Sequence, residues 1–254
     1  MVVDLDPAWL LSIFLVSLRV GVLLMLSPVF TGLTGLVTVR VLLTLALSAV
    51  LVVGLEARPA PVALALGPVV LAALAELVVG ATLAFGVMAA FGAFAVAGKI
   101  IDVQSGFGIG NVFDPVTRAG APLFATLLNM VGVVVFFGMD AHYALLRGLA
   151  FSLRGVAPGA GFAALNGDAV ISHFGLMFSL GVALIVPVML CLLLVEVGLA
   201  VVSRVLPQMN VFVVIVPIKI FAGISILALT VPTLAPAMGK VYASIFTFWE
   251  QVLA

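Results

Sequence analysis

The sequence predicts an all-α integral membrane protein. Its 254 residues are 65% hydrophobic and only 8% charged, and the mean hydropathy is +1.47. A soluble domain is about half apolar and a quarter charged, so a water-facing fold could not cover this much apolar surface. The apolar residues form long uninterrupted stretches, and an α-helix satisfies all its backbone groups within such a stretch when it lies in lipid.

About six apolar stretches fit membrane helices or hairpins, since a spanning helix needs about 20 residues. The first begins after Asp6-Pro7, which is typical of a helix start, and Asp4 and Asp6 stand where a cleavable signal peptide would carry basic residues. The third and fifth stretches are too long to cross as straight helices, so we expect kinks, for instance at Pro187, or packing against other protein. The stretches run near 8–31, 36–56, 61–97, 121–146, 169–203 and 211–238.

The longest polar interruption, residues 98–120, carries alternating glycines. Such a run disfavours helix and strand and can approach other backbone closely. A dinucleotide-binding loop is excluded because Asn111 stands where the third glycine is needed and no strand precedes it. Two interpretations stay open, a simple connector or a segment that occludes a pore. The candidate gate residues are Gln104, Gly106, Phe107, Gly108, Ile109, Gly110, Asn111, Val112 and Phe113.

A compact polar turn separates the last two apolar stretches. Pro207 lacks an amide proton and disfavours helix at the residue before it, so the fifth helix should end there. Polar side chains can bond the backbone groups freed at the turn, which matters where water is scarce. The candidate turn residues are Arg204, Pro207, Gln208, Asn210 and Phe212.

Isolated ionisable residues lie within the apolar stretches, at Arg19, Glu76, Glu196 and Lys219. Each is costly in hydrocarbon, by about 2.5–3.5 kcal/mol on insertion scales, so each should face protein or water. They form either a proton pathway or structural pairs, in which they would meet polar groups on neighbouring subunits. Pairing is favoured because no two of them have the i,i+4 spacing that a relay would favour.

The basic residues other than Arg19 and Lys219 do not set the orientation, because four fall on each side of a six-helix arrangement. One side would hold Arg58, Arg147, Arg154 and Lys240, and the other Arg40, Lys99, Arg118 and Arg204.

No catalytic, metal or cofactor site is predicted. The commonest intramembrane protease motifs are absent, and neither His142 nor His173 has a second ligand at helical spacing. Cys191 is the only cysteine, which excludes an internal disulfide. The formal net charge of zero argues against nucleic-acid binding.

In order and spacing, these motifs resemble the FliR/SctT family, the export-gate subunits of flagellar and injectisome type III secretion. The Pro-Gln-x-Asn-Val-Phe turn is the most specific match, and the family's Gly-x-x-x-Asp-x-Gln-x-Gly element resembles Gly98, Asp102, Gln104 and Gly106. Further matches are Pro28-Val29-Phe30, Arg40, Asp114-Pro115, Asp140-Ala141-His142, Ser152 and Pro158.

The resemblance implies a single membrane domain over 1–254, with helices in 1–97, a plug loop in 98–120, and helices in 121–254 including the hairpin around 203–212. It implies a non-enzymatic subunit in the bacterial inner membrane, in a flagellar basal body or an injectisome base. It also implies that the chain is a core subunit of a helical export-gate assembly, with FliP-like, FliQ-like and FlhB-like subunits as partners. In that assembly the chain would help to form and close a membrane channel for unfolded substrates. The absence of a Trp before Pro158 favours the flagellar branch.

The alternative function is that of an ion-coupled secondary transporter. Such a transporter would use ionisable residues near the middle of the membrane, here Glu76, Asp102, Glu196 and Lys219. Such folds usually contain two similar halves with paired interrupted helices. The sequence shows no convincing internal repeat and one glycine-rich break.

Overall fold

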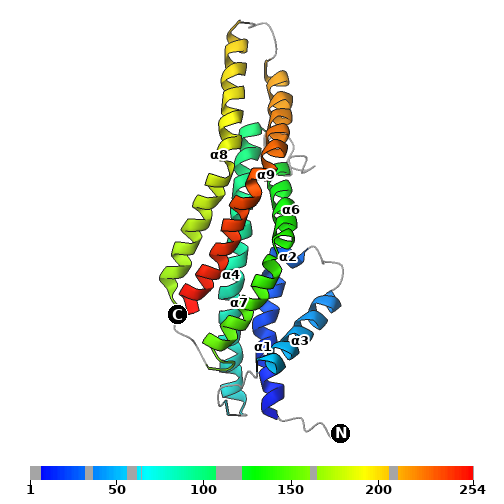
Figure 1. Cartoon of the computed structure of the whole chain (residues 1–254). Helices are drawn as coiled ribbons and strands as arrows, with labels where there is room; N and C mark the ends of the chain where they lie inside the picture. The colour runs from blue at the N-terminus through cyan, green and yellow to red at the C-terminus, as the bar shows by residue number, and fades with distance from the viewer. Residues whose placement is uncertain are drawn as a thin grey trace. The chain divides into compact units, whose positions relative to one another are not determined.

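The computed structural model of the chain is built from α-helices (Figure 1). It describes residues 7–31, 37–55, 62–63, 65–106, 122–160, 165–205 and 211–253, with the backbone alone at 7, 31 and 211–213. No strand occurs within these ranges. The helices are α1 (Pro7–Leu26), α2 (Pro28–Thr31), α3 (Val37–Gly54), α4 (Leu66–Ser105), α6 (Leu123–Gly138), α7 (Ala141–Gly155), α8 (Gly167–Val205) and α9 (Val211–Leu253).

Five of the described helices are long and apolar enough to cross a membrane, namely most or all of α1, α3, α4, α8 and α9. The helices α6 and α7 reach that length only together, as a pair bent at a short break. The described residues therefore contain five helices that could each cross a membrane, or six if the bent pair counts as one, and the predicted all-α membrane fold is confirmed.

Two of the predicted stretches are divided by local breaks. Ser27 separates α1 from α2, because Pro28 has no amide proton and is suited to the first turn of a new helix. Asp140 separates α6 from α7 with a φ of 56°, a left-handed conformation that Asp tolerates better than most residues. Neither break was evident from the apolar pattern.

Two helices continue beyond the ends that the sequence suggested. α4 passes through Gly98 and Lys99 and ends at Ser105, and α9 passes through Pro232 and Pro236 and ends at Leu253. α8 is likewise continuous through Pro187. A proline within a helix removes one backbone hydrogen bond, whereas ending the helix in an apolar setting would deprive many backbone groups of their partners. The helices therefore continue through these prolines.

The contacts of the chain divide it into two compact units, and the first contains residues 1–89, 140–174 and 242–254. Here α1 packs against α3 (Figure 1). Trp249 and Phe248 of α9 are almost completely buried, and the Trp249 indole N–H donates to the Leu83 carbonyl at 3.1 Å. The core can bury this ring because its one polar atom has a partner.

Glycine allows close helix contacts in this first unit. A Cβ atom on Gly80 of α4 would stand 2.8 Å from the backbone oxygen of Arg19 in α1, and one on Gly148 of α7 would stand 2.3 Å from the ring of Trp249. Small residues serve membrane helices in this way because close van der Waals packing is their main source of association.

The second unit contains residues 90–139 and 175–241. Its aromatic core includes Phe91, Phe94 and Phe136, with the Phe91 ring centroid 5.7 Å from that of Phe94 and 6.2 Å from that of Phe136. α4 approaches α8 at Gly181, where a Cβ would lie 2.6 Å from the carbonyl oxygen of Ala93. This unit holds the two helix ends between which the glycine-rich segment runs.

Candidate functional site

The predicted gate segment begins on the last turn of α4. Gln104 belongs to that helix, and its Nε2 donates to the Met189 carbonyl of α8 at 3.0 Å. Gly106 follows with a φ of 80° and donates its N–H to the Val103 carbonyl at 3.2 Å. A glycine in this conformation is the usual way to end a helix. The other gate candidates, residues 107–113, lie outside the described residues.

The start of α6, the next described helix after this segment, is held by Asp102. Its two carboxylate oxygens accept the N–H groups of Phe124, at 2.9 Å, and Ala125, at 3.2 Å, in the first turn of α6. Asp102 is only 2% exposed, and the residue preceding α6, Pro122, provides no side-chain cap. A charged acceptor at a helix N-terminus satisfies orphan amides and complements the helix dipole. Asp102 therefore caps α6 from α4.

Gly98 brings these two helices into contact. A Cβ atom there would stand 2.2 Å from the Cα of Ala125 and 2.4 Å from its backbone nitrogen, so only glycine fits without movement of the backbone. Gly98 lies one helical turn before Asp102, on the same side of α4. Gly98, Asp102, Gln104 and Gly106, hereafter the anchor, thus fix both ends of the segment between α4 and α6.

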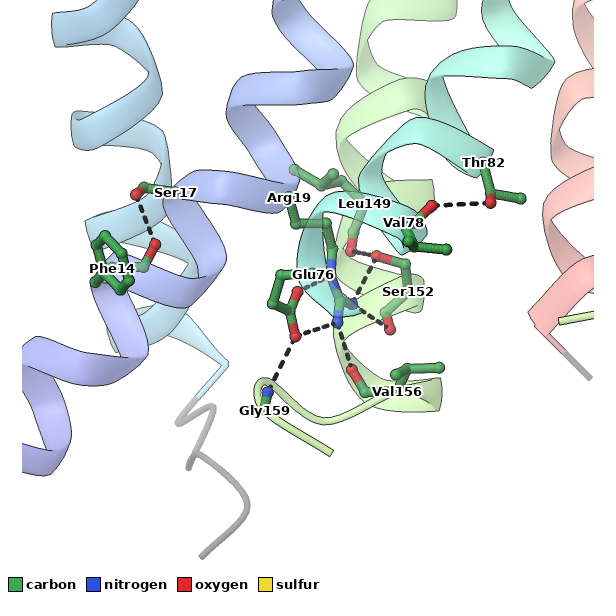
Figure 2. A network of polar contacts seen from close by, with 10 residues as sticks. All are labelled: Phe14, Ser17, Arg19, Glu76, Val78, Thr82, Leu149, Ser152, Val156 and Gly159. Atoms are coloured by element: carbon green, nitrogen blue, oxygen red, sulfur yellow. Dashed lines mark hydrogen bonds and ion pairs between the residues drawn. The ribbon is translucent and has the colours of Figure 1, made fainter. Parts of the chain in front are cut away.

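The first pair of intramembrane charges forms a buried network in the first unit (Figure 2). Arg19 Nε and Nη2 donate to the two carboxylate oxygens of Glu76, at 2.6 and 3.0 Å, and both side chains are at most 2% exposed. The guanidinium also donates to the backbone carbonyls of Ser152, at 2.9 Å, and Val156, at 3.1 Å. The Gly159 N–H completes the network by donating to Glu76 at 3.0 Å.

This network ties α1, α4, the end of α7 and the segment after α7 together. A guanidinium stays protonated in proteins, and here it has a carboxylate and two carbonyls as acceptors. Such a group is suited to holding helices in place rather than to passing protons. Sequence reasoning identified Arg19 and Glu76 but could not pair them, and it did not identify the Ser152 and Val156 carbonyls as acceptors.

The second pair lies in the second unit. Lys219 Nζ of α9 is 3.1 Å from Glu196 Oε1 of α8, with side chains 11% and 51% exposed. Each of the four residues therefore has an oppositely charged partner within the chain. Half of the Glu196 side chain is exposed in the described part of the chain. Its neighbours on α8 are also exposed but apolar, namely Leu193, Leu194 and Val197.

The predicted turn falls largely outside the described residues. Arg204 lies in the last turn of α8 and is exposed, and the α8 helix ends at Val205. Pro207, Gln208 and Asn210 are not among the described residues, and at Phe212 the structure gives only the helical backbone of α9. The roles predicted for these residues stay predictions.

The two histidines have aromatic neighbours. His173 stacks on Phe248 with ring centroids 4.3 Å apart, and its Nε2 lies 3.5 Å from the Gly86 carbonyl oxygen. The His142 ring lies 4.2 Å from that of Tyr143. Within the described ranges, no three His, Cys, Asp or Glu side chains are grouped so that they could hold a metal ion.

Known proteins resemble this chain over most of its length. The family described as bacterial export proteins, family 1, matches residues 10–245. The flagellar biosynthetic protein FliR of Bacillus subtilis is 29% identical over 188 residues, which cover 72% of this chain and 73% of that protein. FliR of Escherichia coli K12 is 26% identical over 183 residues, covering 72% and 70%. The surface presentation of antigens protein SpaR of Shigella flexneri is 32% identical over 152 residues, covering 60% and 59%.

The family match includes the anchor, the buried Arg19–Glu76 network and the polar turn, so the resemblance seen in the motifs is confirmed. The family consists of structural export components rather than enzymes. The chain belongs to the FliR/SctT family of bacterial export proteins, and is a membrane-embedded component of a type III export apparatus.

Proposed function

We propose that the chain is a core subunit of a type III protein-export gate, which forms and closes the membrane channel for unfolded flagellar substrates. The observation that carries this proposal is the anchor, where the Asp102 carboxylate of α4 accepts the Phe124 N–H of α6 at 2.9 Å. It fixes both ends of the glycine-rich segment at one place, as a plug would require. Flagellar relatives such as FliR of Bacillus subtilis support the flagellar branch over the virulence branch.

The plug is assigned to residues 104–113. Glycines at 106, 108 and 110 let the backbone fit a narrow lumen, and Phe107, Ile109, Val112 and Phe113 provide the apolar seal. An apolar constriction blocks water and ions because hydration there is unfavourable. Gln104 and Gly106 form the fixed start of the plug on α4.

The anchor would allow the plug to move while the helices stay in place. Asp102 and Gly98 join α4 to α6 through a charged cap and a backbone contact, and Gln104 joins α4 to α8. The segment between the two ends can leave the pore while these contacts persist. A gate that opens in this way keeps the channel wall intact during export.

Assembly with FliP-like and FliQ-like subunits, and with an FlhB-like subunit, is part of the proposal. Many large apolar side chains on α8 and α9 are exposed, among them Leu194, Phe221 and Leu229, which are at least 70% exposed. Lipid or neighbouring helices would cover them. The exposed half of Glu196 favours neighbouring helices on its side of α8, because a carboxylate is costly against lipid.

The contacts of the ionisable residues support a gate over an ion-coupled transporter. Glu76 is held by Arg19, Asp102 by two backbone amides, and Lys219 by Glu196. A carboxylate that binds and releases a coupling ion must exchange its partners during transport. Among the described residues each of these carboxylates has a partner within the chain, which supports a structural role.

Purification of the full-length tagged chain from bacterial inner membranes tests the proposal. Co-expression with FliP-like and FliQ-like subunits should yield one stable complex, whereas the chain alone should be degraded or aggregated. A detergent-stable chain that is purified alone and transports a small solute after reconstitution would overturn the gate in favour of the transporter.

A further inference from the structure

A groove in the first unit lies outside the parts of the chain that the gate proposal uses. It has a volume of about 240 Å³ and is formed by α7 and the end of α9. Its lining includes the aromatic residues Phe151, Phe246 and Trp249 and two residues of opposite charge, Arg147 and Glu250. Pockets that enclose a drug-sized ligand have about 300–1,000 Å³, so this groove suits a smaller group or one part of a larger molecule.

The wall of the groove is a hydrocarbon surface. The Trp249 ring lies directly on Gly148, and the ring centroids of Phe246 and Trp249 are 5.7 Å apart in an edge-to-face arrangement. The indole N–H of Trp249 already donates to Leu83. The half-buried Phe246 ring therefore offers apolar contact, and the buried Trp249 ring behind it provides no free hydrogen-bond donor.

The two charged groups at the groove remain available to a ligand. Arg147 and Glu250 are exposed and come from different helices. The ion pairs of the described residues involve other side chains, and neither Arg147 nor Glu250 has a hydrogen bond within those residues. A guanidinium binds phosphate oxygens in pairs, and a carboxylate accepts from an ammonium group.

The exposed face of α7 has the composition of a membrane-interface surface. Tyr143 is 58% exposed and Phe151 46% exposed, and each lies about one helical turn from Arg147. Arg154 follows on the exposed side two turns after Arg147. Aromatic and basic residues gather in this way where acyl chains meet headgroups.

We propose that this groove binds a zwitterionic phospholipid with a primary ammonium headgroup, as in phosphatidylethanolamine. Arg147 binds the phosphate, Glu250 accepts hydrogen bonds from the ammonium, and Phe151 and Phe246 cover the glycerol and the first methylenes. An anionic headgroup would meet Arg147 but be repelled by Glu250. A choline headgroup has no N–H to donate to the carboxylate.

Native mass spectrometry of the full-length chain in its purified membrane complex tests this proposal. The complex is incubated with equal amounts of phosphatidylethanolamine, phosphatidylcholine and phosphatidylglycerol. We expect the ethanolamine lipid to be retained over the other two on the order of tenfold, as one charged hydrogen bond allows. Glu250→Gln should remove this preference, and Arg147→Gln should lower retention of all three lipids. Lys240→Gln, an exposed change on α9 outside the groove, should leave retention unchanged.

Equal retention of the three lipids by the unmodified complex overturns the proposal. So does a preference that persists in Glu250→Gln. Efficient cross-linking of Glu250→Cys to another subunit in the assembled complex would also overturn it, because a protein would then occupy the groove.

Discussion

Removing the carboxylate of Glu76 should strongly destabilise the first unit. Glu76→Gln leaves the Arg19 guanidinium charged and buried, where it is 0% exposed. It removes the compensating negative charge and replaces one of the two acceptor oxygens, at 2.6 and 3.0 Å, with an amide NH₂ donor. Loss of one member of a buried ion pair costs about 3–5 kcal/mol because the other charge is left uncompensated. For a chain of this size that corresponds to a fall in Tm on the order of 10 °C.

A double-mutant cycle separates the pair from its surroundings. Arg19→Met also removes the donors to the Ser152 and Val156 carbonyls, so it should cost at least as much as Glu76→Gln. The double variant, Arg19→Met with Glu76→Gln, should cost less than the sum of the single changes, with a coupling of about 2–3 kcal/mol. The assay is thermal unfolding of the purified membrane complex. The readout is the temperature at which this subunit loses its resistance to protease.

Ser17→Ala is the matched control, since Ser17 is also on α1 and its hydroxyl donates only to the local Phe14 carbonyl (Figure 2). It should change stability by less than about 0.5 kcal/mol. If Glu76→Gln is as stable as this control, the pair does not hold the unit together, and the reasoning from its burial is refuted.

Three further changes test the anchor and the turn. Asp102→Ala should cost about 2–3 kcal/mol by leaving two α6 amides unpaired, measured by thermal unfolding of the complex, and an unchanged Tm would contradict the cap. Gly98→Ala should lower Tm by pushing α4 and α6 apart, whereas Gly92→Ala on the same helix, where a Cβ meets nothing within 4 Å, should not; equal effects would refute the contact. Pro207→Ala with Gln208→Ala should prevent assembly by extending α8, and normal recovery of the complex in co-purification would show that the turn is not structural.

The fold class followed from composition because long apolar stretches in lipid leave the backbone few alternatives to helix. Helix ends were harder to predict. The break at Asp140 depends on one left-handed residue, and the extension of α4 to Ser105 depends on contacts with α6 and α8. Neither has a signal in the apolar pattern of its own stretch.

The partners of the charged residues could also not be predicted from the sequence. Arg19 and Glu76 are 57 positions apart, and Asp102 caps a helix whose first bonded amide is 22 positions away. Such pairings are set by tertiary packing rather than by local spacing. The absence of a capping side chain at Pro122 was the one available signal that α6 needed a remote acceptor.

The most direct test of the gate is the ion leak of an assembled complex without its plug. Deleting residues 107–110 retains Asp102 and Gly106, which hold the ends of α4 and α6, and removes half of the apolar seal. The complex should form in normal yield, and membranes containing it should show ion flux well above that of the unmodified complex. Phe107→Ser with Ile109→Ser should also leak, because it keeps the length of the segment but removes apolar side chains. A tight membrane around a normally assembled deletion complex would contradict the account and leave the segment as a connector.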